Sequence, residues 1–478
     1  MESELSASLG LPSRRAWFAR AAQGLGVAAL ASLSQRSPGS NLFAAGQPIP
    51  HLPPHLPPRV RRVIWLFMHG GPSHVDLFDP KPELKRLQGK PLPDSFGMVM
   101  TRRKVAENPL LPSVQPFRPR GQCGMMISDF LPEIAKHADD LCVIRSLHGD
   151  SVNHPQSVYQ MNTGRILMGH PSLGSWVAYG LGSENEDLPA FIVLPDPGGG
   201  LKGGPPAYGS GFLPATYQGI PMRSGSKPIL DMEPAHPTPI AVQRRTLDLL
   251  QQFNRDHLHL RDQEDALAAR VRSYELAFRM QSAAPELVDI AQEPISMQSL
   301  YGLDQPHTAE FGTRCLLARR MIERGVRFVQ LYSGNTEGWD AHSDVLKNHT
   351  QLCRATDLPI AGLLTDLKQR GLWDDTLVIW GGEFGRMPMS EQGKGRDHNP
   401  WGYTMWLAGG AIRGGMTYGG TDDVGLRAVD QPVSIHSFHA TLLHLLGIDA
   451  ESLSFPHNGL DERLIGPEPV PVIKDWLA

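Results

Sequence analysis

The chain has 478 residues, enough for one large α/β domain or two ordinary ones, and its 41% hydrophobic and 20% charged residues are the balance of a globular protein. A formal net charge of −4 gives no electrostatic reason to expect a nucleic-acid partner. The scattered cysteines show no CxxC zinc spacing, and the sequence leaves open whether they form one or two disulfides.

The N-terminal residues have the pattern of an export signal. Arg14 and Arg15 precede a weakly apolar run, residues 24–33, which is too short to span a bilayer. This order is typical of the twin-arginine route. We therefore expect a cleavable signal segment over 1–46, a proline-rich linker over 47–60, no stable transmembrane anchor, and an exported protein that is periplasmic or extracellular.

From residue 61 to about 470, apolar runs of strand length alternate with helical patterns. The expected strands are 63–68, 141–144, 191–194, 326–331, 376–380 and 403–408. The expected helices are two within 240–283 with a break near 255–261, then 310–324, one through 360–367, and 437–446. Residues 195–235 are rich in Gly and Pro and read as a long insertion. Strands separated by helices predict one α/β domain over 61–470 with a mostly parallel sheet.

The turn after the first expected strand carries His69, His74 and Asp76 around Gly70 and Gly71. The stretch lacks the order of a phosphate-binding P-loop, and no G-x-G-x-x-G follows a strand anywhere in the chain. We take His69 as a metal-ligand candidate, and His74 and Asp76 as residues that could orient it.

Three further segments place His or acidic residues beside strand ends. Asp340 and His342 lie two apart, so both side chains point to one side of an extended backbone. Glu383 follows the run 376–380, and His398, with Asp397 beside it as a secondary candidate, precedes the run 403–408. Open α/β sheets collect their ligands at such ends. Mixed His and carboxylate ligands favour zinc, manganese or iron over calcium, with zinc and manganese first.

Several motifs resemble those of the alkaline phosphatase superfamily, which includes sulfatases. The strand followed by GGEFG is similar to its strand-Ser-Asp-His-Gly element, GRDH at 395–398 to a later metal-binding element, and Asp340 with His342 to its Asp…His metal pair. The chain resembles more closely an exported family catalogued as domain of unknown function 1501. The matching motifs are HGGPSHVDLFDPKP, NHPQSVYQMNTGR, GGEFGR, GRDHNPWGYTMWLAGG and HATLLHLLGID. The resemblance implies an alkaline phosphatase-like α/β fold with helices on both faces of the sheet, and a divalent metal.

The chain departs from that superfamily at positions that matter for mechanism. Sulfatases place a Cys or Ser nucleophile eleven residues before the Arg of a Thr-Gly-Arg, and here that count leads from Arg165 to His154. Where the superfamily has Asp and His, positions 69 and 384 are His and Phe, which implies that one of its two metal sites is altered. His154 is therefore a candidate nucleophile, ligand or general base.

The sequence thus predicts a metal-dependent hydrolase of a phosphate or sulfate ester. A bound divalent ion lowers the pKa of its water toward ~7, so no protein nucleophile would be needed. Arg165 and Arg386 are candidates for binding the anionic substrate, a small ester or a sulfated or phosphorylated polymer. The alternative is a non-catalytic exported binding or scaffold protein that keeps the fold.

Overall fold

The computed structural model of this chain describes residues 52–223, 238–259, 265–335 and 337–478. The expected signal segment, 1–46, and the first residues of the linker lie outside this part. The described residues fall into two units: 238–275 belong to one, and 52–223 with the residues from Leu276 to Ala478 form the larger one. The sequence did not indicate this division.

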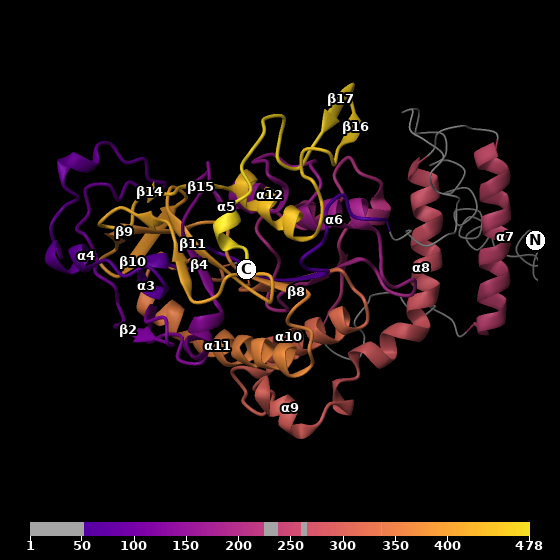
Figure 1. Cartoon of the computed structure of the whole chain (residues 1–478), viewed down its shortest axis with the longest axis horizontal. Helices are drawn as coiled ribbons and strands as arrows, with labels where there is room; N and C mark the ends of the chain where they lie inside the picture. Colours follow the sequence, from indigo (N-terminus) through magenta and orange to yellow (C-terminus); the bar gives the residue numbers. More distant parts are fainter. Residues whose placement is uncertain (1–51, 224–237, 260–264, 336) are drawn as a thin grey trace, which may run out of the picture. The chain divides into compact units, whose positions relative to one another are not determined.

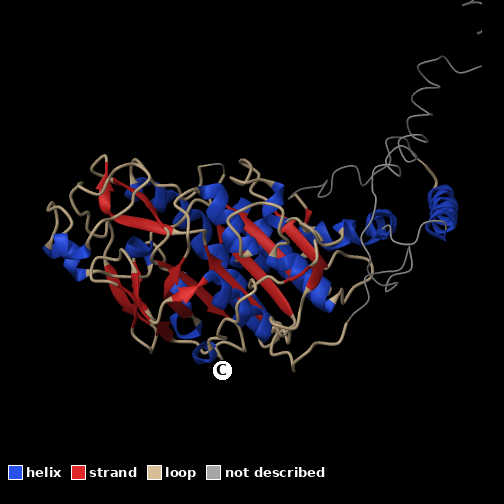
Figure 2. Cartoon of the chain, turned by 90° about the horizontal axis from the view of Figure 1, so that it is seen from above, coloured by secondary structure: helices blue, strands red, loops and turns tan. Residues whose placement is uncertain are grey.

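A nine-stranded sheet forms the centre of the larger unit (Figure 2). The strands follow the order β12 (Met416–Tyr418), β4 (Cys142–His148), β11 (Tyr403–Ala408), β8 (Thr376–Gly381), β1 (Arg62–Met68), β7 (Phe328–Ser333), β5 (Phe191–Leu194) and β6 (Ile220–Pro221), with β15 (Val433–Ser434) also paired to β4. Only the pairs of β11 with β4 and β8 are antiparallel among these neighbours. The sheet is therefore mixed, and β11 is its reversed strand.

Helices cover both faces of this sheet (Figure 1). One face is covered by α5 (His154–Thr163), α6 (Leu173–Leu181) and α12 (Ile435–Leu445), and the other by the 3₁₀ helix η2 (Ile134–Asp140), α10 (Ala309–Glu323) and α11 (Val345–Gln369). Along β1, Trp65 and Phe67 pack in the hydrophobic core on the face covered by α5, α6 and α12. Ile64 and Leu66 pack in the core on the face covered by η2, α10 and α11. Successive side chains of a strand point to opposite faces, which is why a fully apolar run becomes a central strand.

The parallel register brings three strand ends to one edge of the sheet. Met68 of β1 is paired with Ser333 of β7, and Phe67 with Gly381 of β8. The residues that follow these strands therefore emerge side by side, as the sequence predicts for ligands at strand ends.

The antiparallel hairpin of β9 (Gly385–Glu391) and β10 (Gly395–Asn399) was not predicted. It turns at Gln392 and Gly393, with φ of 50° and 81°, a left-handed pair typical of tight hairpin turns. The sequence analysis treated this stretch only as a turn before β11, so it missed that His398 lies opposite Arg386 in a ladder.

The remaining elements lie around this framework. They are α3 (His74–Leu77), α4 (Pro82–Arg86), α9 (Ile295–Leu300), the 3₁₀ helices η1 (Asp94–Phe96), η3 (Pro205–Tyr208), η4 (Ala215–Tyr217), η5 (Ile290–Gln292) and η6 (Lys474–Trp476), and the hairpins β2 (Phe117–Arg120) with β3 (Met125–Ser128), β13 (Gly420–Thr421) with β14 (Ala428–Asp430), and β16 (Phe455–His457) with β17 (Leu460–Glu462).

Two helices occupy the region expected to hold two, α7 (Ile240–His259) and α8 (Asp265–Val288). The residues between them, 260–264, lie outside the described part. Arg244 of α7 pairs with Glu275 of α8 at 2.8 Å, a contact between two residues of the smaller unit, whose boundary falls within α8 after Glu275.

Cys123, Cys142, Cys315 and Cys353 are all free, which answers the question of disulfides that the sequence left open. Among the described residues, no helix combines the length and apolar character that crossing a bilayer requires.

Candidate metal and catalytic site

Five residues from four segments of the chain meet at the carboxyl edge of the sheet. His69 follows β1, Asp340 and His342 lie on the loop after β7, Glu383 follows β8, and His398 lies on β10. His154, the first residue of α5, joins them from the side. The cluster is thus assembled from segments up to 329 residues apart, from His69 to His398 (398 − 69 = 329).

At one end of the cluster, three ligand atoms face one another. The Nε2 of His342 lies 2.9 Å from Asp340 Oδ1, the Nε2 of His398 lies 3.1 Å from the same oxygen, and the two nitrogens are 3.0 Å apart. Both rings are fixed on their other side: Nδ1 of His342 lies 2.5 Å from Glu391 Oε2, and Nδ1 of His398 lies 2.6 Å from the carbonyl of Val152.

These contacts determine where the ring protons lie. Each Nδ1 faces an acceptor and must carry the proton, so the Nε2 of a neutral ring keeps its lone pair. Burial lowers the pKa of His398 well below its usual value, more strongly than the hydrogen bond with Asp340 raises it. In their neutral forms the two rings therefore turn their Nε2 lone pairs toward the same space as the Asp340 carboxylate oxygen, which is the arrangement of a cation site.

Asp340 is the centre of the charge network. Its Oδ1 also accepts a hydrogen bond of 2.7 Å from Arg386, while Oδ2 lies 2.8 Å from Lys202 Nζ and 2.9 Å from His154 Nε2. Burial by itself would raise the pKa of Asp340, but the Arg386 charge and the hydrogen bonds of the histidines hold it far below its usual range. Asp340 is therefore a carboxylate at any pH near neutrality.

His154 connects this group to the rest of the cluster. Its Nδ1 lies 2.6 Å from Glu383 Oε1, so the ring is held between two carboxylates and is 1% exposed. Glu383 also accepts the backbone N–H of Gly70 at 3.0 Å. Burial would raise the pKa of Glu383, yet the hydrogen bond from His154 and the charges nearby keep it below its usual value.

His69 is engaged on both ring nitrogens. Its Nδ1 donates to the carbonyl of Asn335 at 3.2 Å, and its Nε2 accepts the backbone N–H of Lys202 at 3.2 Å. Its ligand atoms, with those of His154 and Glu383, still lie within 4.8 Å of one another. Burial lowers the pKa of His69, so the ring is kept neutral.

The structure does not bring Arg165 to this cluster. Arg165 follows the C-terminal end of α5, ten residues long, whereas His154 begins it, which separates them by ~15 Å along the helix axis. The guanidinium of Arg165 lies against Gly466 instead.

Arg386 lies in the cluster but faces no open space. It is 0% exposed and donates to the carbonyls of Gly70 and Gly71 as well as to Asp340. It therefore holds the first turn against Asp340 and has no free face for a substrate anion.

The other secondary candidates also have structural partners. Asp76 forms an ion pair of 2.8 Å with Arg396, and His74 contacts the carbonyl of Gly425 at 2.8 Å, so neither orients His69. Asp397 accepts the backbone N–H groups of Arg103 and His398, each at 2.8 Å, and so supports β10 from beside the ligands.

Sequence reasoning missed two residues that contact the candidate ligands, Lys202 and Glu391. Lys202 lies in the Gly/Pro-rich stretch, where no pattern singles out one lysine. Glu391 ends β9, and recognition of the hairpin turn after it would have placed it near His398. The ring of Phe384 stacks on His398 with ring centres 4.5 Å apart and forms an apolar wall of the site.

The fold and the cluster together define a mixed α/β protein with a candidate cation site at the carboxyl edge of its sheet. The chain belongs to the family described as "Protein of unknown function (DUF1501)", whose model matches residues 60–477. A search of the curated proteins finds no match.

Three solved structures resemble this chain weakly over most of its length. A member of that superfamily from Vibrio parahaemolyticus aligns over 92% of this chain and 77% of its own, with 10% identity and a TM-score of 0.36. The PsFucS1 sulfatase from Pseudoalteromonas sp. aligns over 82% and 68%, with 12% identity and a TM-score of 0.34. The phosphonate monoester hydrolase SpPMH from Silicibacter pomeroyi aligns over 68% and 70%, with 10% identity and a TM-score of 0.31. Likeness at this level carries no argument about the reaction of this chain.

Proposed function

We propose that this protein is a metal-dependent hydrolase of phosphate or sulfate esters that acts outside the cytoplasm. The observation that carries the proposal is the meeting of His342 Nε2, His398 Nε2 and Asp340 Oδ1 within 3.1 Å of one another. Protons can bridge the three atoms at this distance, and a divalent cation can take the place of those protons, because each Nε2 and the carboxylate oxygen has a lone pair to offer once deprotonated.

These residues fit a divalent metal. Two imidazoles and one carboxylate are ligands that zinc and manganese accept, and the partners of each Nδ1 match the second layer that usually supports metal-bound histidines. Asp340 Oδ1 can accept from Arg386 and still offer a lone pair, since a carboxylate oxygen has two. A divalent ion held here would supply a Lewis acid that withdraws charge from an ester oxygen.

Lys202 is the better candidate for binding the anionic group of the substrate. Its ammonium lies at the edge of the cluster with a side chain 21% exposed, and it pairs with Asp340 at 2.8 Å. By contrast, Arg386 is buried and Arg165 lies at the other end of α5. We assign to Lys202 the role that the sequence analysis gave to these arginines.

His154 is placed to hold or move a proton between Glu383 and Asp340. The nearby serines are committed elsewhere: Ser151 donates to Gln156 at 2.7 Å and Ser157 to the carbonyl of Ser151 at 2.7 Å. These contacts support a reaction with no covalent intermediate on Ser or Cys, in which His154 serves as a general acid or base.

Metal binding can be tested before any substrate is known. Adding zinc or manganese to stripped protein should raise its thermal stability, by ~2.7 kcal/mol at a hundredfold excess over Kd, because the ion binds the folded state. The same addition should leave His342→Ala and His398→Ala unchanged. His307→Ala, at an exposed histidine away from the site, is the matched control and should respond like the wild type.

Catalysis needs a separate measurement, with aryl phosphate monoesters, diesters and aryl sulfates assayed in each metal. We expect His154→Ala to lower turnover by roughly 10²–10⁴-fold, the usual range for general acid–base help, and Asp340→Ala with His342→Ala to abolish it. If metal binds but no ester turns over, the alternative of a non-catalytic binding protein replaces this proposal.

A further inference from the structure

A row of five side chains in contact passes through the candidate metal site and reaches solvent at both ends. It runs from Lys202 through Asp340, His342 and Glu391 to Arg103, and successive members approach to 2.8, 2.9, 2.5 and 3.5 Å. The three inner side chains are at most 12% exposed, whereas those of Lys202 and Arg103 are 21% and 46% exposed. The candidate metal site therefore lies between two accessible cations.

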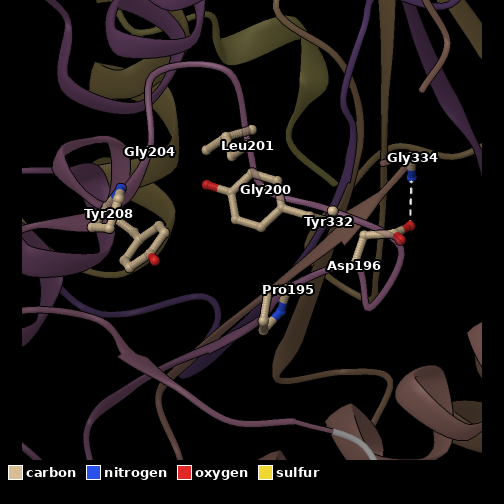
Figure 3. Close-up of a pocket in the computed structure, with 10 residues that line it drawn as sticks. Pro195, Asp196, Gly200, Leu201, Gly204, Tyr208, Tyr332 and Gly334 are labelled. Carbon is tan, nitrogen blue, oxygen red and sulfur yellow. Dashed lines mark hydrogen bonds between the residues drawn. The ribbon is translucent and has the colours of Figure 1, made fainter. Parts of the chain in front are cut away.

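The loop after β5 holds the first of these cations. Where the loop begins, Asp196 accepts the backbone N–H of Gly334 at 2.9 Å (Figure 3). Just beyond Lys202, the carbonyl of Gly203 accepts the hydroxyl hydrogen of Tyr159 at 2.7 Å. Lys202 is thus fixed from both sides, and its ammonium stays at one edge of the candidate metal site.

Arg103, the second cation, lies in a surface turn that is anchored to the hairpin β9–β10. The backbone N–H of Arg103 donates to Asp397 at 2.8 Å, and a hydrogen bond of 3.1 Å from the N–H of Val105 to Thr101 Oγ1 closes the turn. Val105 is 2% exposed and packs in a hydrophobic cluster with residues of β9. These anchors leave residues 102–104, the basic turn, exposed at the tip.

Further cations lie beside the basic turn. Lys394 directly precedes β10, and Lys347 lies in the first turn of α11, which docks on the carbonyl of Lys394 by a backbone hydrogen bond of 3.0 Å. Of these five cations, only Arg103 forms an ion pair with a residue that the structure describes. The carboxylates of the same segments are fewer, namely Glu107, Asp344 and Glu391. This local excess of positive charge contrasts with the formal net charge of −4 of the whole chain.

We propose that the basic turn is a second anion-binding subsite, and that the substrate is a linear polymer with a phosphate or sulfate group on each unit. One anionic group would lie at the candidate metal site beside Lys202, and another at the basic turn. A small monoester has a single anionic group and cannot contact cations on both sides of the site. The assignment deepens the proposed function, on which its catalytic meaning rests, but binding to these cations needs no metal.

The first test is isothermal titration calorimetry of the full chain in EDTA, with inorganic polyphosphate and dextran sulfate as the phosphorylated and sulfated probes. At least one polymer should bind ~10-fold or more tightly than orthophosphate or sulfate ion, because linked groups engage two subsites. Its affinity should fall as salt rises, since charge contacts are screened and counterions are released. The polymer that binds more tightly identifies the class, and polymers that bind no better than the single ions would overturn the proposal. Because EDTA removes metal, failure of the metal proposal would leave this result unchanged.

Two sets of variants locate the polymer. Arg102→Gln, Lys104→Gln and Lys394→Gln together should weaken its binding about 3- to 100-fold, the range for three exposed charge contacts, and should leave binding of the single ions unchanged. The matched control removes the same charge from exposed positions in other segments, by Arg223→Gln, Arg413→Gln and Lys474→Gln, and should bind the polymer like the wild type. An equal loss in both sets would show a general effect of charge and would exclude the subsite.

Lys202→Gln tests whether one polymer spans both ends of the row. It should weaken polymer binding independently of the changes in the basic turn, because the two cations are separate contacts. Polymer affinity that does not respond to Lys202→Gln would refute the bridging. Oligothymidylate should bind more weakly than the preferred polymer, because residues 97–105 hold no aromatic side chain on which bases could stack. Tighter binding of the oligonucleotide would point to nucleic acid and overturn the proposed class.

Discussion

Glu391 orients the ring of His342, one of the candidate ligands. The contact of 2.5 Å between Nδ1 and Glu391 Oε2 fixes both the proton and the orientation of the ring. Outer partners of this kind are a large part of a metal site, because they raise the basicity of the ligand and remove its rotational freedom.

We therefore predict that Glu391→Gln lowers metal affinity 10- to 100-fold while the ligands themselves remain. The amide keeps an acceptor for Nδ1 but loses the charge. Titration with a competing chelator measures the change. Glu451→Gln, at an exposed glutamate, is the control, and an equal loss there would show that the effect is not local.

His439 makes the stability of the fold depend on pH for a reason that does not involve the candidate site. It is fully buried in α12, its Nε2 lies 2.8 Å from the carbonyl of Met161, and burial lowers its pKa to about 3. The unfolded chain takes up this proton near pH 6.5, whereas the folded chain does not. The stability that this histidine contributes is therefore complete above pH 6.5 and is lost as the pH falls toward 3.

We predict that the free energy of unfolding of His439→Gln falls less steeply than that of the wild type as the pH is lowered from 6 to 4. The difference in slope should be about 1.4 kcal/mol per pH unit. Glutamine can still donate to Met161 but does not titrate. Urea unfolding at several pH values gives the slope, and the exposed His307→Gln should not alter it. A variant with the wild-type slope would contradict the expectation.

At the scale of elements, the hairpin β9–β10 carries His398 and packs against the loop that carries Asp340 and His342. It is docked on the loop after β7 by backbone hydrogen bonds of 3.0 Å from Arg396 to Ala341 and from Val345 to Lys394. At Gly395 the approach is so close that an added Cβ would lie 1.7 Å from the carbonyl oxygen of His342. His342 and His398 therefore depend on one close backbone contact.

Gly395→Ala should separate the hairpin β9–β10 from the loop after β7. We expect a loss of at least ~1–3 kcal/mol of stability, the usual cost of overpacking, together with loss of metal binding. Thermal unfolding with and without metal measures both effects. Gly420→Ala is the matched control, since its nearest atom is Asp430 Cβ at 3.8 Å, an ordinary contact. Normal metal binding in Gly395→Ala would exclude this role for the hairpin.

At the scale of the whole molecule, the predicted export signal belongs to residues outside the described part. We expect replacement of Arg14 and Arg15 by lysine to leave the precursor inside the cell, because the twin-arginine route reads the guanidinium pair. Fractionation and immunoblotting measure the distribution. Arg20→Lys is the control, and unchanged periplasmic yield in the double variant would refute this route.

The sequence by itself determined the class of fold and most of the candidate ligands. Runs such as 63–68 and 376–380 are apolar on both faces, which only a covered central strand explains, and the residues after them had to meet at one edge. His69, Asp340, Glu383 and His398 could be predicted for this reason, without knowledge of any contact.

Only the tertiary structure decided what each side chain does. Arg386 proved to be a buried support of Asp340, while Lys202, 138 residues before Asp340, supplied the accessible cation. Proton positions on His342 and His398 follow from Glu391 and Val152, partners that no local pattern identifies. Hydrophobic periodicity is a local property of the chain, whereas charge pairing and hydrogen bonding in this site join segments that are far apart in sequence.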